Sequence, residues 1–197
     1  MSAAGLPYPH TPLRFDAGRI CLDLLATTHP VERIDGVDRL RSWCLGAGLV
    51  PPGTPLAEAG TPWLHAFREL RAHVGHLVRG ELDGRPAARS LAHVNAAALA
   101  APPAPRALRT AEGRLVRALH ADPGCAALLA AVARDALDLL TDPRARSGLR
   151  RCAGDNCPLV YLDTSRGRRR RWCSSQTCGN RERVARHRRR AAAHAPA

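Results

Sequence analysis

The chain has 197 residues, and its 30 basic residues, all of them arginine, outnumber its 17 acidic residues to leave a net charge of +13. Residues 1–143 hold 15 arginines and 14 acidic residues, whereas the last 54 residues hold 15 arginines and only three acidic residues. A near-neutral body therefore precedes a segment of net charge +12, a pattern typical of polyanion binding. The apolar share of 45% excludes wholesale disorder.

The chain contains no run of the roughly 18 to 20 apolar residues that a membrane helix requires. Residues 1–10 contain prolines and lack the basic stretch followed by an apolar run that is typical of a secretion signal. We therefore expect a cytoplasmic protein without a membrane partner. In a reducing cytoplasm its seven cysteines should be thiols or metal ligands, not disulfides.

The body is expected to be mainly helical. Residues 19–27 predict a short buried helix or a strand, because periodicity alone does not separate the two. An apolar i, i+3, i+4, i+7 pattern predicts a helix after Gly36, and prolines and glycines predict a loop over residues 50–60. The strongest helix then begins with Thr61 as cap and Pro62 at its first position, and runs to about residue 79.

Three more elements complete the body. An alanine-rich helix is expected over residues 86–100, followed by a β-hairpin of residues 107–110 and 115–120. A last helix over residues 123–140, with Asp122 as its cap, places an apolar stripe on one face. We interpret residues 1–143 as a regulatory or sensor domain that takes a small-molecule effector or forms a homodimer.

Other candidate sites in the body carry less information. His65, His73 and His76 do not share one face of their helix, so the sequence does not predict a metal site there. Cys44 and Cys125 lie on apolar helix faces and are read as packing residues rather than reactive thiols. No stretch presents a convergent acid–base pair or an activated nucleophile, so we do not expect an enzyme.

Four cysteines form two Cys-x4-Cys pairs separated by 15 residues, and these are Cys152, Cys157, Cys173 and Cys178. Zinc prefers four thiolate or imidazole ligands in a tetrahedron, and two close pairs joined by a short excursion supply them. An iron–sulfur cluster, disulfides or simple packing are the alternatives. Because four thiolates leave no open position for water, we expect one structural Zn2+ ion rather than a catalytic one.

The residues around the pairs predict a knuckle, a hairpin and a helix. A turn is expected at residues 154–156, hairpin strands at residues 159–162 and 170–173, and a helix over residues 176–190 behind Ser174 and Ser175 as caps. The expected class is α+β, with a mainly helical domain (residues 1–143), a treble-clef-like zinc-stabilised domain (residues 144–190) and a disordered tail (residues 191–197).

The arginines of this small domain predict nucleic-acid binding, although a charge run can also be a merely solvated face. With Cys178 directed toward the metal, the outward face of the helix comprises Asn180, Arg183, His187 and Arg190. Arginine suits guanine and asparagine suits adenine in a major groove. Phosphate contacts are expected from the flanking residues Arg168, Arg169, Arg170, Arg171, Arg181 and Arg186. The segment offers few aromatic residues for stacking, which favours double-stranded DNA over RNA or single strands.

Residues 172–175 (WCSS) and 178–181 (CGNR) resemble the CGNR zinc-finger family, and the likeness covers residues 148–187. In that family the finger follows an ABATE domain, whose opening resembles residues 19–27. The resemblance implies a stress-induced bacterial transcription regulator, with zinc on the four clustered cysteines and DNA contact near Asn180 and Arg181. We therefore expect a DNA-binding transcription regulator; a redox-responsive zinc–thiolate interaction module and an RNA-binding protein are the alternatives.

Overall fold

The computed structural model describes residues 12–193. Residues 1–10, whose sequence gave no sign of a targeting segment, lie outside this described part. Residues 194–197 of the predicted disordered tail lie outside it as well. The described helices and strands are, in chain order, α1 (Ile20–Leu25), α2 (Val37–Gly46), α3 (Thr61–Asp83), α4 (Ala88–Ala97), β1 (Pro105–Arg109), β2 (Leu115–Leu119), α5 (Cys125–Thr141), α6 (Pro143–Arg146), β3 (Leu149–Arg151), β4 (Val160–Leu162) and α7 (Asn180–Ala193). Two separate antiparallel strand pairs beside these helices confirm the α+β class.

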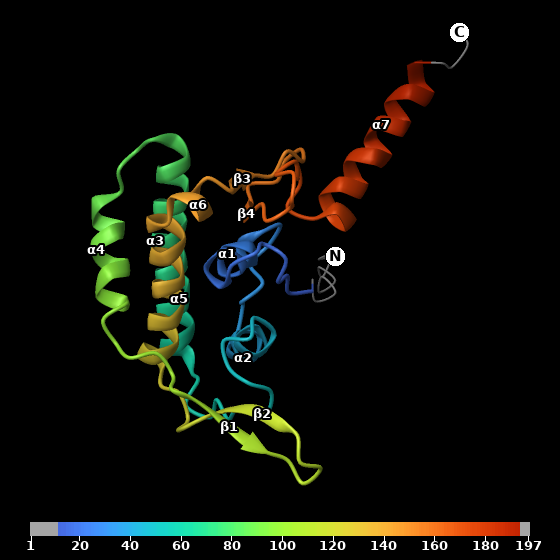
Figure 1. Cartoon of the computed structure of the whole chain (residues 1–197). Coiled ribbons are helices and arrows are strands. Elements are labelled where there is room, and N and C mark those ends of the chain that lie inside the picture. Colours follow the sequence, from blue (N-terminus) through green and yellow to red (C-terminus); the bar gives the residue numbers. More distant parts are fainter. Residues whose placement is uncertain (1–11, 194–197) are drawn as a thin grey trace, which may run out of the picture.

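Helices α3, α4 and α5 lie side by side, and α1 packs across α3 and α5 (Figure 1). The apolar stripe of α3 explains this layer, because Phe67 and Val74 on that stripe are fully buried. Trp43 of α2 meets Phe67 edge-to-face with ring centroids 6.0 Å apart. None of the helices within residues 12–193 has the length and apolarity needed to cross a membrane.

The helix starts differ from the expected ones. The cap of α3 is Gly60 instead of Thr61, which is the first helical residue, and the cap of α5 is Gly124 instead of Asp122. Neither cap makes a side-chain hydrogen bond, so burial of the apolar stripes, rather than capping, stabilises these helices. The ambiguous residues 19–27 form helix α1 and a following 3-10 turn.

The predicted β-hairpin in the body is confirmed. β1 pairs antiparallel with β2, with Leu108 opposite Val116, and the turn between them includes Gly113 at a φ of 79°. The hairpin extends from the end of the molecule opposite α7 (Figure 1). Its strands are exposed except near Leu119, so the hairpin contributes little to the core.

The second strand pair differs from the prediction. β4 was expected to pair with residues 170–173, but its partner is β3, with Arg150 opposite Tyr161. Residues 170–173 instead run as irregular chain, which Ala153 holds by donating its N–H to the carbonyl of Arg171 at 2.8 Å. The residues of β3 lie before the first cysteine pair, so local pattern alone did not identify them as the partner.

The strand pair is joined to the start of the body. The N–H of Leu162 donates to the carbonyl of Ala17 at 2.8 Å, and β4 packs on α1. Tyr161 is fully buried, and one continuous hydrophobic core includes residues from Ala17 to Cys178. The C-terminal part is therefore packed against the body and does not hang from a linker. Helix α7 continues to Ala193, three residues into the segment predicted as a disordered tail.

Gly18 provides a test of this junction. Its φ of 93° is unfavourable for any residue with a Cβ, and an added Cβ would lie 3.2 Å from both the Cβ and the carbonyl oxygen of Leu162. We expect Gly18→Ala to lower the free energy of unfolding by about 1–3 kcal/mol in urea denaturation. Gly167→Ala is the control, because that glycine is exposed, lacks a left-handed φ and would make only ordinary contacts. Equal stability of the two variants would contradict the assigned junction.

Candidate metal centre and nucleic-acid interface

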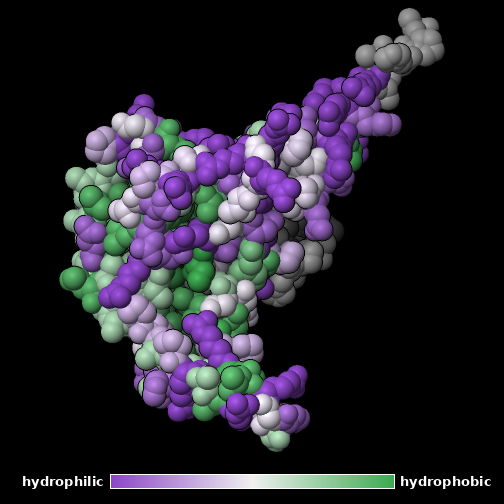
Figure 2. All heavy atoms as spheres, in the orientation of Figure 1, coloured by the Kyte–Doolittle hydropathy of each residue, from purple (hydrophilic) through white to green (hydrophobic). Residues whose placement is uncertain are grey.

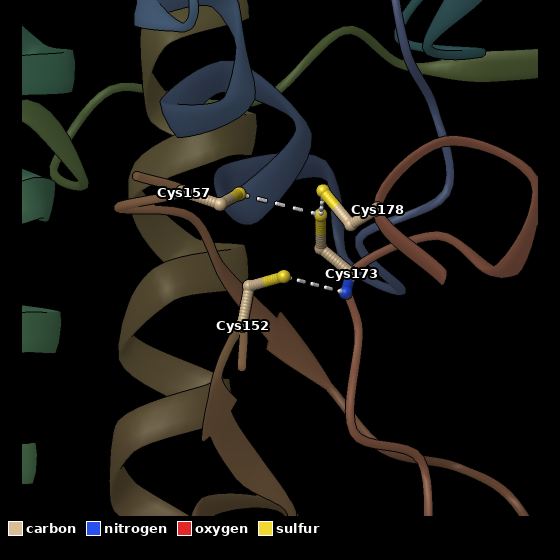
Figure 3. A group of neighbouring side chains, drawn as sticks. All are labelled: Cys152, Cys157, Cys173 and Cys178. Atoms are coloured by element: carbon tan, nitrogen blue, oxygen red, sulfur yellow. Dashed lines mark hydrogen bonds between the residues drawn. The ribbon is translucent and has the colours of Figure 1, made fainter. Parts of the chain in front are cut away.

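The four clustered cysteines come together from separate segments of the chain, three in loops and Cys178 in a helical turn (Figure 3). The Sγ atom of Cys173 lies 3.7 Å from that of Cys157 and 3.6 Å from that of Cys178, and all four sulfur atoms lie within 4.8 Å of one another. A tetrahedron with zinc–sulfur bonds of about 2.3 Å places its sulfur atoms roughly 3.8 Å apart. The cluster thus has the dimensions of a zinc site, and the chain binds one structural zinc ion.

Two backbone N–H groups point at the sulfur of Cys152. The N–H of Cys173 donates to this Sγ at 3.3 Å and that of Gly154 at 3.4 Å. Burial opposes ionisation of Cys152, but these donors favour the thiolate and hold its pKa below the ordinary value. The same two donors can stabilise the Cys152 thiolate when it binds the ion.

The other three cysteines depend on the ion for their charge. Burial raises the pKa of Cys157, Cys173 and Cys178 to about 11 each, so these groups are thiols at neutral pH in the metal-free protein. Zinc ligation replaces their protons, which couples metal binding to proton release. Four thiolates around Zn2+ carry a net charge of −2, and this charge requires nearby donors.

Arg14 supplies such a donor from the body. Its guanidinium nitrogens lie 3.5 Å from the Sγ of Cys173, and Nη2 also donates to the carbonyl of Cys173 at 3.3 Å. Asp16 orients this guanidinium through an ion pair of 2.9 Å. A cation here partly offsets the negative charge of the zinc–thiolate group. The sequence reasoning missed Arg14, because it lies 159 residues from Cys173 in the chain.

The arginine-rich turn between the two cysteine pairs is organised by Asp163. This carboxylate accepts hydrogen bonds from the N–H and hydroxyl of Ser165, at 2.9 and 2.6 Å, and from the N–H of Arg170 at 3.0 Å. The hydrogen bond from Ser165 is the main cause of its lowered pKa. Tyr161 closes the turn by donating its hydroxyl to the carbonyl of Arg170 at 2.5 Å.

Arg170 is directed into the protein. Its guanidinium donates to the carbonyls of Trp172 at 2.9 Å, Asp16 at 3.0 Å and Cys173, and lies 4.6 Å from the centre of the Tyr161 ring. The guanidinium of Arg170 is therefore hydrogen-bonded to backbone carbonyl groups of the protein. Arg170 was predicted to meet phosphate, but its observed contacts give it a role in holding the zinc site instead.

The neighbouring arginines of the turn stay exposed, namely Arg168, Arg169 and Arg171. Arg171 lies 5.1 Å from the centre of the Trp172 ring, and Arg168 donates to the hydroxyl of Ser147 at 2.5 Å. An open depression of about 530 Å³ lies beside Arg169, Arg171 and Trp172. The turn between the two cysteine pairs therefore presents three exposed cations.

The start of α7 is tied directly to the zinc site. Cys178 lies in a π-helical turn, Ser175–Gly179, whose cap Ser174 accepts a hydrogen bond from the N–H of Thr177 at 3.2 Å. The predicted capping role of Ser174 is thus confirmed. Gly179 is buried beside the Trp172 ring, where an added Cβ would lie 3.4 Å from it. The turn that carries Cys178 therefore fixes the direction of the helix that follows.

Helix α7 presents one half-buried side and one exposed side. Glu182 and Ala185 are half-buried and adjoin a small cavity of 30 Å³ beside Gly154 and Asp155. At about 100° per residue, the opposite side carries the four residues predicted to face outward. All four are exposed: Asn180, Arg183, His187 and Arg190. Arg181 and Arg186 are exposed as well, and Figure 2 shows the helix as a hydrophilic projection.

The fold and the four-thiolate centre define a zinc-finger protein with a helical body. Residues 18–143 match the model of the ABATE family, described as "Putative stress-induced transcription regulator". Residues 149–191 match that of the CGNR zinc finger. Because the first match covers more than half of the chain, the chain belongs to the ABATE family, and the predicted resemblance is confirmed. No curated protein matches the chain.

Loss of one ligand tests the metal centre. We expect Cys178→Ala to reduce bound zinc from one ion per chain to near zero, because three thiolates close neither the tetrahedron nor the turn that begins α7. Elemental analysis after gel filtration measures the zinc, and circular dichroism measures the loss of helix. Cys125→Ala is the matched control, because this cysteine lies in α5, outside the cluster. Full zinc content in Cys178→Ala would refute the ligand assignment.

Proposed function

We propose that the protein is a transcription regulator that binds double-stranded DNA through α7 and the arginine-rich turn. The main support is the position of α7, which follows the turn that carries Cys178 and projects away from the body (Figure 1). Residues 180–193 contain six arginines and one glutamate, so the projecting element is strongly cationic. Such an element attracts the phosphate backbone.

The exposed side of α7 suits a major groove. The groove of B-DNA admits an α-helix, and Asn180 and Arg183 carry the groups that recognise adenine and guanine. Arg183 donates to the carbonyl of Ser175 at 3.3 Å, a weak contact that a guanine can replace. We assign base contacts to Asn180, Arg183, His187 and Arg190, and phosphate contacts to Arg168, Arg169, Arg171, Arg181 and Arg186. Arg170 is left out because its guanidinium donates to backbone carbonyls of Trp172 and Asp16.

The body is proposed to regulate this binding rather than to catalyse a reaction. It shares one hydrophobic core with the finger, and two ion pairs also join them: Glu81 with Arg146 and Asp83 with Arg151, at 3.4 and 2.6 Å. Exposed pairs of this kind contribute little stability, so the shared hydrophobic core is the main connection. An effector or a second copy that binds the body, in the cytoplasm, would thus act on the finger through packed contacts.

The salt dependence of DNA binding tests this function. With about five phosphates neutralised, a plot of log Kobs against log salt concentration for the zinc-loaded chain should have a slope of roughly −4 to −5. Fluorescence anisotropy with labelled duplexes measures it. We expect Arg186→Gln to make the slope less negative by about 1, because one phosphate contact is lost. Arg85→Gln removes an equal charge from an exposed loop of the body and should leave the slope unchanged.

The sequence preference is measured by selecting bound fragments from genomic DNA. One enriched motif that is lost in Arg183→Gln supports base recognition by α7. Absence of salt-dependent duplex binding would refute the proposal. Preference for structured RNA in competition, or zinc release by peroxide without duplex affinity, would favour the RNA-binding or the redox-responsive alternative.

A further inference from the structure

A second group of potential metal ligands lies in the body, between α3 and α4. Glu69 and His73 of α3 and His93 of α4 each offer one ligand atom, and these three atoms lie within 4.8 Å of one another. The Nδ1 atom of His93 lies 4.0 Å from Oε1 of Glu69. The rings of His73 and His93 are stacked, with centroids 4.0 Å apart and planes inclined by 24°. Three potential metal ligands from two helices thus lie close together.

The convergence depends on the packing of two helices. Glu69 and His73 are four residues apart and therefore share one face of α3. The neighbouring helix α4 adds His93 to this face, and the two helices are in extensive contact. Comparison of the histidines within α3 alone did not indicate a site, because the group needs a carboxylate from α3 and an imidazole from α4. His65, by contrast, is exposed and takes no part in the group.

A buried hydroxyl group orients the central imidazole. Ser90 is only 6% exposed, and its Oγ lies 3.2 Å from Nδ1 of His73 and 3.5 Å from Nδ1 of His76. A contact that engages Nδ1 leaves Nε2 of His73 for a metal ion, the arrangement in which a ligating histidine is held by its other nitrogen. Burial and the imidazole of His93 lower the pKa of His73, despite the opposing effect of Glu69.

We propose that Glu69, His73 and His93 bind a divalent transition-metal ion that links α3 to α4. Two imidazoles and one carboxylate suit Zn2+ or Ni2+ and disfavour Mg2+ and Ca2+, which take oxygen ligands. Ligand atoms around such an ion lie roughly 3.4 Å apart, so separations of up to 4.8 Å must shorten by as much as about 1.4 Å, and the stacked imidazole rings must turn toward the ion. The side chain of Glu69, 63% exposed, is free to make this movement. The remaining positions are open to water or to His76.

The ion would connect helix α3 to helix α4 within the body, at a site separate from the four-cysteine zinc centre. It binds the folded arrangement of α3 and α4 and not the separated helices, so it stabilises the native state by mass action. The proposal does not rest on DNA binding, and it gives the body a ligand of defined chemistry.

Nickel binding to the full-length, zinc-loaded chain tests the site. We expect equilibrium dialysis with elemental analysis to find one Ni2+ per chain in addition to the retained zinc. At about a hundredfold excess of Ni2+ over Kd, Tm should rise by roughly 5 °C. Glu69→Gln and His93→Gln should each weaken nickel binding by about tenfold or more. His65→Gln, a histidine change on the same helix, should leave it unchanged.

The stability and the nickel affinity of the variants together decide whether the site exists. Tm without nickel verifies that the variants fold, and Glu69→Gln keeps the test valid if His93→Gln is destabilised, because Glu69 is exposed. Weakened binding in Glu69→Gln with an unchanged His65→Gln supports the site. No second metal, nickel that only displaces zinc, or affinity that is the same in Glu69→Gln and in the parent overturns it.

Discussion

Four thiolates that converge on one zinc ion determine where the basic helix points. Helix α7 cannot stabilise itself by burial, because its one large apolar residue, Val184, is 43% exposed. Its direction comes from the π-helical turn that carries Cys178, and this turn is fixed by ligation. Structural zinc contributes on the order of 10 kcal/mol to a small domain, far more than the few apolar contacts of α7 can supply. The ion is thus the physical origin of the projecting cationic surface.

The zinc centre in turn depends on the body. Arg14 donates to the Sγ of Cys173, and the carbonyl of Ala17 accepts a hydrogen bond from Leu162 in the strand pair of the finger. Residues at the beginning of the described chain and residues more than 140 positions later are therefore parts of one packed unit. A change in the packing of α1 reaches β4 directly, since the two elements are in contact. This arrangement suits a regulator whose body controls its finger.

Arginines of similar sequence context have different roles here. Arg170 donates to two carbonyl groups of the finger and to the carbonyl of Asp16 in the body, whereas Arg169 and Arg171 beside it are exposed. Net charge counts these residues alike, but only an exposed guanidinium can neutralise a phosphate. The histidines show the same distinction: His73 gains a role from its neighbours on α4, and His65 on the same helix has none of these neighbours.

The sequence by itself determined the features that depend on near neighbours: the helices from their apolar periodicity, the body's hairpin, the four zinc ligands from their spacing, and the cap at Ser174. Only the tertiary structure decided the pairing of β3 with β4, the inward direction of Arg170, the contact of Arg14 with Cys173, and the meeting of Glu69 with His93. The physical reason is that apolar periodicity, turn residues, caps and ligand spacing are patterns along the chain itself. The other contacts depend on which backbone and side-chain groups the packing of the folded chain brings together.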